Sequence, residues 1–333
     1  MLALWHWHIE ISSKCTLKCP RCPRQEVPDT LVNTELTLEF FKKNFTPQFI
    51  LDNVEKITFC GDDGDPIYAH DLIDVIRYFK SIKPVEFVII TNGSYKKSDW
   101  WVELGSILDN NDSVHFSIDG YDEYSNNLYR VNSNFDSIIN GIKVLRANSG
   151  CSIVWAAIAF KFNEDKLEYM RTMAKNLGMD KFQLTKSTKF NFNNALYPIN
   201  DPLQPKDSLI STAGRFERII TDFTNKPKKV NHSNIINYFK HKNKDKILPL
   251  CYVGNKGLYI SSQGFLFPCC WVANRYSHNS EWKEISNKFN LNNIDLVNAL
   301  KHEFWASEFT SFKWNECSNK CAKNSDTNYY LEW

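Results

Sequence analysis

The segment Ser13–Arg24 reads Ser-Lys-Cys-Thr-Leu-Lys-Cys-Pro-Arg-Cys-Pro-Arg and carries Cys15, Cys19 and Cys22 in one short loop. It follows directly on an apolar, strand-like run, Trp5–Ile11. Three thiolates at this spacing can converge on a single soft-metal site. Three is one fewer than a structural zinc site or a fully ligated iron–sulfur cube requires, so an open position would remain for a substrate or cofactor. The alternative is a zinc loop that borrows a distant fourth ligand.

Outward from this segment, the first half of the chain alternates strand-like runs with amphipathic patterns. The runs are Trp5–Ile11, Lys56–Phe59, Glu86–Ile90, Val114–Ile118, Ser152–Phe160 and Phe182–Leu184. Helical periodicity predicts helices over Asp71–Ile82, Phe135–Leu145 and Glu164–Leu177. Gly178 stands where a helix C′ glycine is expected. This alternation predicts βαβ units, a parallel sheet and an α/β fold. Six repeats fall short of a closed eight-fold barrel, so we expect a partial (β/α)6 barrel or an open wound sheet, with ligand sites at the carboxyl ends of the strands.

The pattern changes after residue 190. Phe190–Lys206 is rich in Asn and Pro and is typical of a loop, and Arg215–Phe223 is predicted as a helix. Lys226–Lys246 is a Lys-, Asn- and His-rich connector, which is more typical of a solvated face than of a binding patch. The expected division is a barrel over residues 1–190, a bridging region over 191–247 and a small C-terminal domain over 248–333.

Composition excludes several classes of protein. With 43% hydrophobic and 14% aromatic residues in 333, the chain can bury a core and is not of the disordered type. A net charge of +2 gives no reason to expect a nucleic-acid partner. No secretory signal precedes the first strand, and the apolar runs are too short to span a bilayer. We therefore expect a soluble, cytoplasmic protein with no membrane partner.

The C-terminal region holds a second group of cysteines. Its candidate metal ligands are Cys251, Cys269, Cys317 and Cys321. The run Tyr259–Cys269 predicts a hairpin that carries a cysteine beyond its turn. Four thiolates suit either zinc or a fully ligated 4Fe–4S cluster. Cys270 is an adjacent spare that could replace Cys269. Cys60 and Cys151 belong to no motif and are expected to be small buried hydrophobic residues.

The first cysteine segment resembles the radical-SAM superfamily, whose Cys-x3-Cys-x2-Cys loop follows the first strand of a partial (β/α)6 barrel. The resemblance implies that Cys15, Cys19 and Cys22 bind three irons of a 4Fe–4S cluster. The amino and carboxylate groups of S-adenosylmethionine (SAM) would chelate the fourth. Reduction by one electron, implied to come from a flavodoxin- or ferredoxin-type donor, would yield a 5′-deoxyadenosyl radical that abstracts a substrate hydrogen. Arg21 stands where the family usually has an aromatic residue, which puts the local adenine contact in doubt.

Later strand ends also resemble family elements. Cys60–Pro66 is similar to the Gly-Gly-Glu-Pro element that grips the methionine amino group, with Asp65 in place of Glu. The resemblance further implies that Ser117 or Asp119 faces the ribose and that Arg130 pairs with the methionine carboxylate. The residues implied to bind SAM are Gly61, Asp63, Gly64, Asp65, Pro66, Asn92, Ser117, Asp119 and Arg130.

The C-terminal layout resembles the twitch domain, the shortened form of the SPASM extension of radical-SAM enzymes. The stretch Cys251–Cys269, with Gly264 between the cysteines, fits its signature. The resemblance implies that Cys251, Cys269, Cys317 and Cys321 bind one auxiliary 4Fe–4S cluster.

For the reaction, we expect oxidative modification of a peptide or protein: a cross-link, a dehydrogenation or an epimerisation. One alternative is dehydrogenation of a small molecule such as an amino sugar, and another is a non-enzymatic iron–sulfur or zinc protein. Because the barrel starts within a few residues of Met1, we expect no fused leader-peptide domain, so a peptide would need a separate recognition partner or direct binding in the cleft.

Polar strand-end residues and spare thiols are the catalytic candidates. They are Lys161, Gln183, Lys186 and Cys270. For an epimerisation, a thiol would be the natural hydrogen donor, and Cys60 and Cys151 are candidates beside Cys270.

Overall fold

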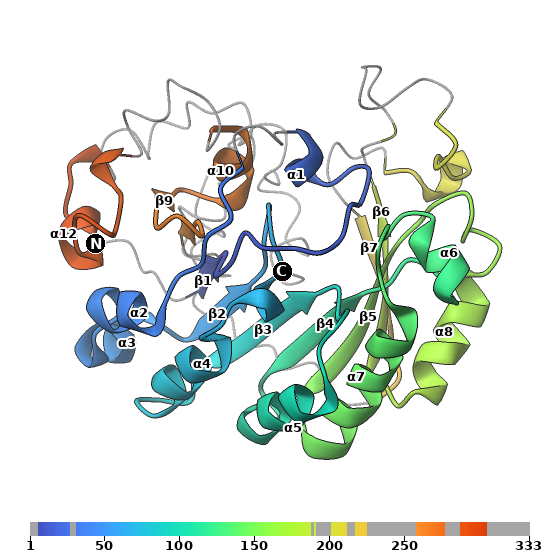
Figure 1. Cartoon of the computed structure of the whole chain (residues 1–333), viewed down its shortest axis with the longest axis horizontal. Coiled ribbons are helices and arrows are strands. Elements are labelled where there is room, and N and C mark those ends of the chain that lie inside the picture. Colours follow the sequence, from blue (N-terminus) through green and yellow to red (C-terminus); the bar gives the residue numbers. More distant parts are fainter. Residues whose placement is uncertain are drawn as a thin grey trace, which may run out of the picture.

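The computed structural model describes residues 6–26, 31–187, 190, 201–211, 217–224, 258–276 and 287–304. In this part of the chain a nine-stranded sheet has the order β7-β6-β5-β4-β3-β2-β1-β8-β9 (Figure 1). The strands are β1 (His6–Ile9), β2 (Lys56–Phe59), β3 (Glu86–Thr91), β4 (Ser113–Ser117), β5 (Ser152–Ile158), β6 (Lys181–Lys186), β7 (Glu217–Asp222), β8 (Tyr259–Ile260) and β9 (Leu266–Phe267). Strands β1 to β6 are parallel in chain order, β7 runs antiparallel to β6, and β8 runs parallel to β1. The predicted α/β fold with an unclosed, mostly parallel sheet is confirmed.

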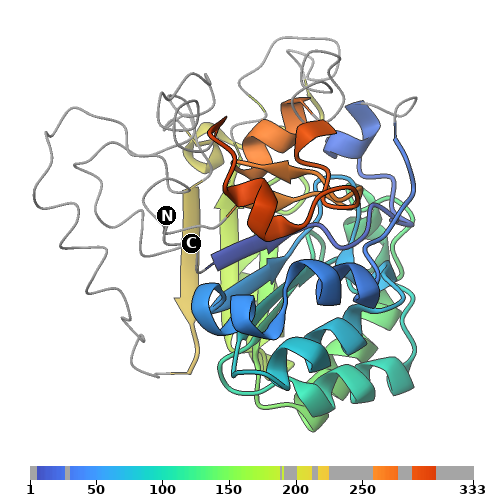
Figure 2. The same cartoon turned by 90° about the vertical axis from the view of Figure 1, so that its left-hand side faces the viewer.

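Helices cover the outer face of this curved sheet (Figures 1 and 2). The α-helices are α1 (Pro23–Glu26), α2 (Leu38–Asn44), α3 (Pro47–Asn53), α4 (Leu72–Lys80), α5 (Ser98–Ile107), α6 (Glu123–Asn127), α7 (Phe135–Asn148), α8 (Leu167–Asn176), α10 (Cys270–Tyr276) and α12 (Leu296–Leu300). Two single 3-10 turns, Pro66–Tyr68 and Asp207–Leu209, complete the described elements. None of the described helices is both long and apolar enough to cross a bilayer.

Helix α7 illustrates how the sequence produces these elements. The Asn134 side chain caps its first turn by accepting from the Ser137 N–H, and its apolar side chains at helical spacing are buried against the sheet. Gly141 lets α7 approach α5, since a Cβ there would lie 2.6 Å from the Trp101 Nε1. The helix thus packs on one continuous core that runs under all the parallel strands.

The six predicted strands and the three predicted helices are all present, with ends shifted by a few residues. Gly178 has a φ of +73°, as expected of a glycine that ends a helix. The helix predicted over Arg215–Phe223 is wrong, because Glu217–Asp222 forms the edge strand β7. Its β-branched residues suit a strand, and hydrogen bonding to the open edge of β6 outweighs the helical spacing of its apolar residues.

The predicted hairpin is present, and its turn contains Gly264 with a φ of +82°. We call β8 and β9 with their turn, residues 259–267, the C-terminal hairpin. Because β8 pairs with β1, this hairpin extends the main sheet beside the first strand (Figures 1 and 2). The described residues of the predicted loop Phe190–Lys206 belong to no helix or strand. The predicted connector Lys226–Lys246 is not among the described residues.

Candidate functional site

The three cysteines of the first motif lie on a loop that leaves the carboxyl end of β1. We call residues 13–24 the cysteine loop. Its backbone is held by a hydrogen bond from the Lys18 N–H to the Val131 carbonyl, 2.9 Å, and by a turn in which the Cys22 N–H donates to the Cys19 carbonyl, 3.1 Å. Cys19 is buried, while Cys15 and Cys22 are partly exposed. A small apolar cluster lies under these thiols and is made of Leu17, Tyr129, Phe160, Phe190 and Ile210. The cysteine loop therefore packs on a layer of buried apolar side chains.

The chemistry of these thiols fits a soft-metal cluster. Burial raises the pKa of Cys15 to about 12 and also raises the pKa of Cys19, so neither thiol ionises readily by itself and a bound cation would have to favour the thiolate. N–H groups of Leu17 and Asn92 point at the Cys15 Sγ from 3.4 and 3.8 Å, as donors to a thiolate would. Among the described residues no three Cys, His, Asp or Glu side chains are placed to hold one metal ion. In a 4Fe–4S cluster each thiolate binds a different iron, so its cysteines need not converge on a single ion.

The loop after β2, residues 60–65, packs directly on the cysteine loop, and we call it the glycine loop. Both positions in this loop require glycine, because any side chain would collide with neighbouring backbone. A Cβ on Gly64 would lie 2.1 Å from the Ser12 carbonyl oxygen. On Gly61 a Cβ would lie 2.2 Å from the Gly64 carbonyl oxygen. The Asp65 N–H donates to the Lys14 carbonyl at 3.0 Å, which closes the contact between the two loops. The resemblance implied that Gly61 and Gly64 bind SAM, and in the structure the atoms that approach both glycines most closely are protein backbone.

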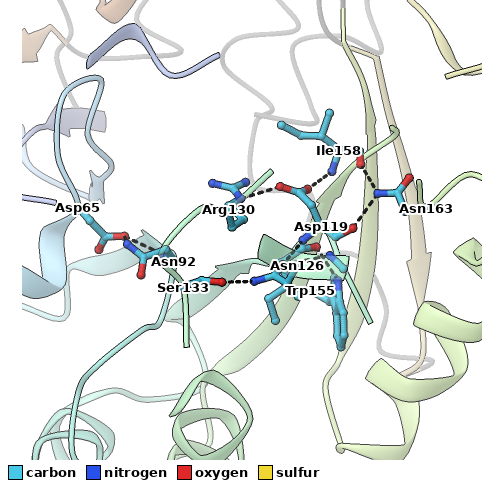
Figure 3. A network of polar contacts seen from close by, with 11 residues as sticks. Asp65, Asn92, Asp119, Asn126, Arg130, Ser133, Trp155, Ile158 and Asn163 are labelled. Atoms are coloured by element: carbon cyan, nitrogen blue, oxygen red, sulfur yellow. Dashed lines mark hydrogen bonds and ion pairs between the residues drawn. The ribbon is translucent and has the colours of Figure 1, made fainter. Parts of the chain in front are cut away.

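Asp65 is fully engaged inside the protein (Figure 3). One carboxylate oxygen accepts from the Ile67 N–H and the Thr91 hydroxyl at 3.2 and 2.8 Å. The other accepts from both the backbone and the side-chain N–H of Asn92, each at 2.6 Å. Burial raises the pKa of Asp65, and these hydrogen bonds oppose the rise. In the structure Asp65 therefore ties the glycine loop to the end of β3.

Asp119 and Arg130 form an ion pair at the end of β4 (Figure 3). The Arg130 Nε donates to Asp119 Oδ2 at 2.6 Å, and the Ile158 N–H donates to Oδ1 at 2.6 Å. Burial disfavours the Arg130 cation, but the charges of Asp119 and Cys19 outweigh burial and raise its pKa. Arg130 also hydrogen-bonds Cys19, and its charge opposes the effect of burial on the pKa of that thiol. A permanent cation thus lies beside the cysteine loop.

Two asparagines that sequence reasoning did not assign to the site hold this ion pair in place (Figure 3). The Asn126 Oδ1 accepts from the N–H groups of Asp119 and Gly120, each at 3.0 Å, and its amide donates to the Ser133 hydroxyl at 2.9 Å. The Asn163 amide donates to the carbonyls of Asp119 and Ile158, each at 2.8 Å. The sequence feature that could have pointed to them is their position, since Asn126 comes after the end of β4 and Asn163 after the end of β5.

The polar catalytic candidates lie after β5 and on β6. Lys161 is exposed, and its N–H donates to the Leu203 carbonyl. Gln183 and Lys186 are partly buried on β6. Ser117 is the last residue of β4 and is partly buried next to the Asp119 region. Within the described part of the chain no hydrogen bond or ion pair joins the side chains of Lys161, Gln183 or Lys186 to the cysteine loop, and their roles stay predictions.

Arg21, which departs from the family's aromatic residue, is buried. It forms an ion pair with Asp201, and its guanidinium lies 5.0 Å from the centre of the Phe190 ring. The side chain thus connects the cysteine loop to the segment after β6, which the sequence predicted as a loop.

The C-terminal cysteines are only partly described. Cys269 and Cys270 are partly exposed, and the Ala273 N–H donates to the Cys269 carbonyl in the first turn of α10. Burial first, then the negative charges of Asp62 and Cys270, raise the pKa of the Cys60 thiol. Cys151 is buried immediately before β5, at the amino ends of the parallel strands, whereas the cysteine loop leaves a carboxyl end, so its position argues against a role as hydrogen donor. The other ligand candidates, Cys251, Cys317 and Cys321, lie outside the described residues.

Comparisons with known proteins agree with this arrangement. The sequence profile of the Radical SAM superfamily matches residues 9–173. The antilisterial bacteriocin subtilosin biosynthesis protein AlbA of Bacillus subtilis (strain 168) is 22% identical over 319 residues, which are 95% of this chain and 64% of that protein. The chain thus spans less than two thirds of the length of this curated relative.

Solved structures of Streptococcus suis SuiB have a similar fold. SuiB bound to its precursor peptide SuiA superposes with a TM-score of 0.60 at 15% identity, covering 96% of this chain and 70% of SuiB. SuiB bound to S-adenosylmethionine superposes with a TM-score of 0.54 at 14% identity, covering 82% of this chain and 62% of SuiB.

Proposed function

Because residues 9–173 of this chain are a radical SAM domain, we propose that the protein binds a 4Fe–4S cluster through Cys15, Cys19 and Cys22 and uses SAM to modify a peptide or protein oxidatively. When bound, the cluster and SAM supply the one-electron chemistry that cleaves SAM reductively and removes a hydrogen atom from the substrate. The observation that carries the proposal is the position of the three thiols, on one anchored loop at the carboxyl end of β1, in contact with the glycine loop and Arg130.

The residues around this loop supply charge and geometry. Arg130, held by Asp119, places a fixed positive charge beside Cys19, where it would offset the negative charge of thiolates or of a ligand carboxylate. The glycine loop brings backbone close to the cysteine loop through the Asp65 N–H to Lys14 carbonyl bond. These contacts support the assignment of both elements to SAM binding.

The apolar cluster under the cysteine loop supports radical chemistry in particular. Leu17, Tyr129 and Phe160 are all buried there, and the Tyr129 and Phe160 rings lie 4.3 Å apart at their centres. These buried apolar side chains exclude water from one side of a site where a reactive species must react only with the substrate C–H bond. Packing on this cluster also holds the cysteine loop in place.

For the substrate we propose a peptide or protein. The support is that the curated relative is named for the biosynthesis of a bacteriocin and that one SuiB structure holds a precursor peptide. We further propose that Cys251, Cys269, Cys317 and Cys321 hold an auxiliary cluster that accepts an electron from the substrate. A flavodoxin- or ferredoxin-type protein would supply the electron for SAM cleavage, and a separate recognition protein could present the peptide.

The test is anaerobic reconstitution with iron and sulfide, followed by dithionite, SAM and chromatographic measurement of 5′-deoxyadenosine. The proposal expects about eight irons per chain and formation of 5′-deoxyadenosine. Mass spectrometry of short peptides encoded beside the gene then tests the substrate, with a loss of about two mass units expected for a cross-link or dehydrogenation and none for an epimerisation. Binding of zinc alone, or bound iron without SAM cleavage, overturns the proposal.

A further inference from the structure

Glu10 joins two segments that are far apart in the sequence. It is the first residue after β1 and its side chain is buried, with 2% of the residue exposed. One carboxylate oxygen, Oε1, accepts from the backbone N–H groups of Asp63 and Gly64 in the glycine loop, at 2.7 and 3.1 Å. The other oxygen, Oε2, accepts from the Ser262 hydroxyl in the turn of the C-terminal hairpin, at 3.2 Å. A single side chain thus contacts both segments.

Backbone pairing reinforces this connection. The Glu10 N–H donates to the Ile260 carbonyl at 2.9 Å, which continues the pairing of β1 with β8. Glu10 also lines a small cavity between the two segments, together with Asp63 and Ser262. Beyond the hairpin the chain reaches Cys269 and Cys270, which pack against the buried cluster that contains Tyr259 and Phe267 of the hairpin. The relation between the two segments therefore depends on contacts centred on Glu10.

We propose that Glu10 is a positioning residue that fixes the glycine loop and the C-terminal hairpin in one relative placement, and so sets SAM against the cysteines that follow the hairpin. The inference rests on the proposed function, which assigns the first segment to SAM and the second to the auxiliary cluster. Glu10 acts through hydrogen bonds that a neutral side chain of the same shape can make. A glutamine can accept both N–H groups on its single oxygen and donate its amide to the Ser262 hydroxyl.

The test compares Glu10→Ala, Glu10→Gln and Ser262→Ala in the reconstituted protein by hydrogen exchange with mass spectrometry and by equilibrium SAM binding. Glu10→Ala should speed amide exchange in both the glycine loop and residues 259–267, and should weaken SAM binding by about tenfold or more, because two backbone donors lose their acceptor. Glu10→Gln should keep both properties within about twofold. Ser262→Ala should speed exchange in the hairpin only.

A matched control separates positioning from general loss of stability. Val114→Ala creates a cavity at a fully buried position in β4 that contacts neither segment, so it should lower the melting temperature and leave local exchange in both segments unchanged. The inference is overturned if Glu10→Ala leaves exchange and SAM affinity as in the wild type, or if Glu10→Gln is as damaging as Glu10→Ala. Absence of SAM cleavage by the wild type would refute the proposed function but not the positioning role of Glu10, because the exchange measurement does not depend on turnover.

Discussion

The ion pair between Asp119 and Arg130 shows at the scale of single residues how the site is charged. Both side chains are largely buried, and Asp119 also accepts from the N–H of Ile158, the last residue of β5, so both carboxylate oxygens of Asp119 have a protein donor. A buried pair of this kind adds little to stability by itself, but removal of one partner leaves a charge without compensation. Its value here is that it places a cation beside Cys19.

Asp119→Asn should therefore weaken both folding and SAM binding. The substitution keeps an oxygen for the Ile158 N–H and leaves Arg130 without its counter-charge, so we expect a loss of about 3 kcal/mol in the free energy of unfolding. Urea unfolding of the apoprotein measures this loss, and SAM binding to the reconstituted variant measures the second effect. As a control, Asp136→Asn changes a carboxylate in the first turn of α7 and should cost about 0.5 kcal/mol. Equal effects of the two variants would contradict this role of Asp119.

At the scale of elements, the site depends on how closely the cysteine loop and the glycine loop approach. Gly64→Ala should separate them, because the added Cβ would lie 2.5 Å from the Cα of Ser13, the first residue of the cysteine loop, and 2.1 Å from the carbonyl oxygen of the preceding Ser12. Gly178→Ala is the matched control, since φ at Gly178 is +73° and the nearest atom to its Cβ would be 3.7 Å away. Both variants should lose about 1 kcal/mol or more of stability. Only Gly64→Ala should lower SAM affinity, by about tenfold, and a similar loss in Gly178→Ala would contradict the assignment.

The elements also show what the sequence could predict. Runs such as Ser152–Phe160 predict strands because buried parallel strands are locally apolar, and the cysteine loop is visible because its three cysteines are close in sequence. Strand β7 was predicted as a helix because its pairing with β6 is a tertiary property. The contact between Glu10 and Ser262 leaves no local pattern either, since 252 positions separate the two residues.

At the scale of the whole molecule, Glu10 makes stability depend on pH. Burial, with a further contribution from Asp63, raises its pKa from 4.5 to about 7, so the folded protein keeps a proton that the unfolded chain releases. The contribution of Glu10 to stability is therefore complete below pH 4.5 and is lost as pH rises to about 7. The loss amounts to about 3 kcal/mol.

Unfolding of the wild-type apoprotein and of Glu10→Gln at pH 5 and pH 8 measures this contribution. Glutamine has no proton to lose, so the variant should gain stability relative to the wild type on going from pH 5 to pH 8. A difference between the two proteins that does not change with pH would contradict the raised pKa of Glu10.

The central claim is that the cysteine loop binds the cluster that cleaves SAM, and the triple variant Cys15→Ala, Cys19→Ala, Cys22→Ala tests it most directly. After anaerobic reconstitution, iron content and 5′-deoxyadenosine formation are measured beside the wild type. We predict no detectable 5′-deoxyadenosine and retention of about four irons per chain at the C-terminal cysteines. Continued SAM cleavage by the variant would contradict the claim, and loss of all the iron would contradict the division of the cysteines between two clusters.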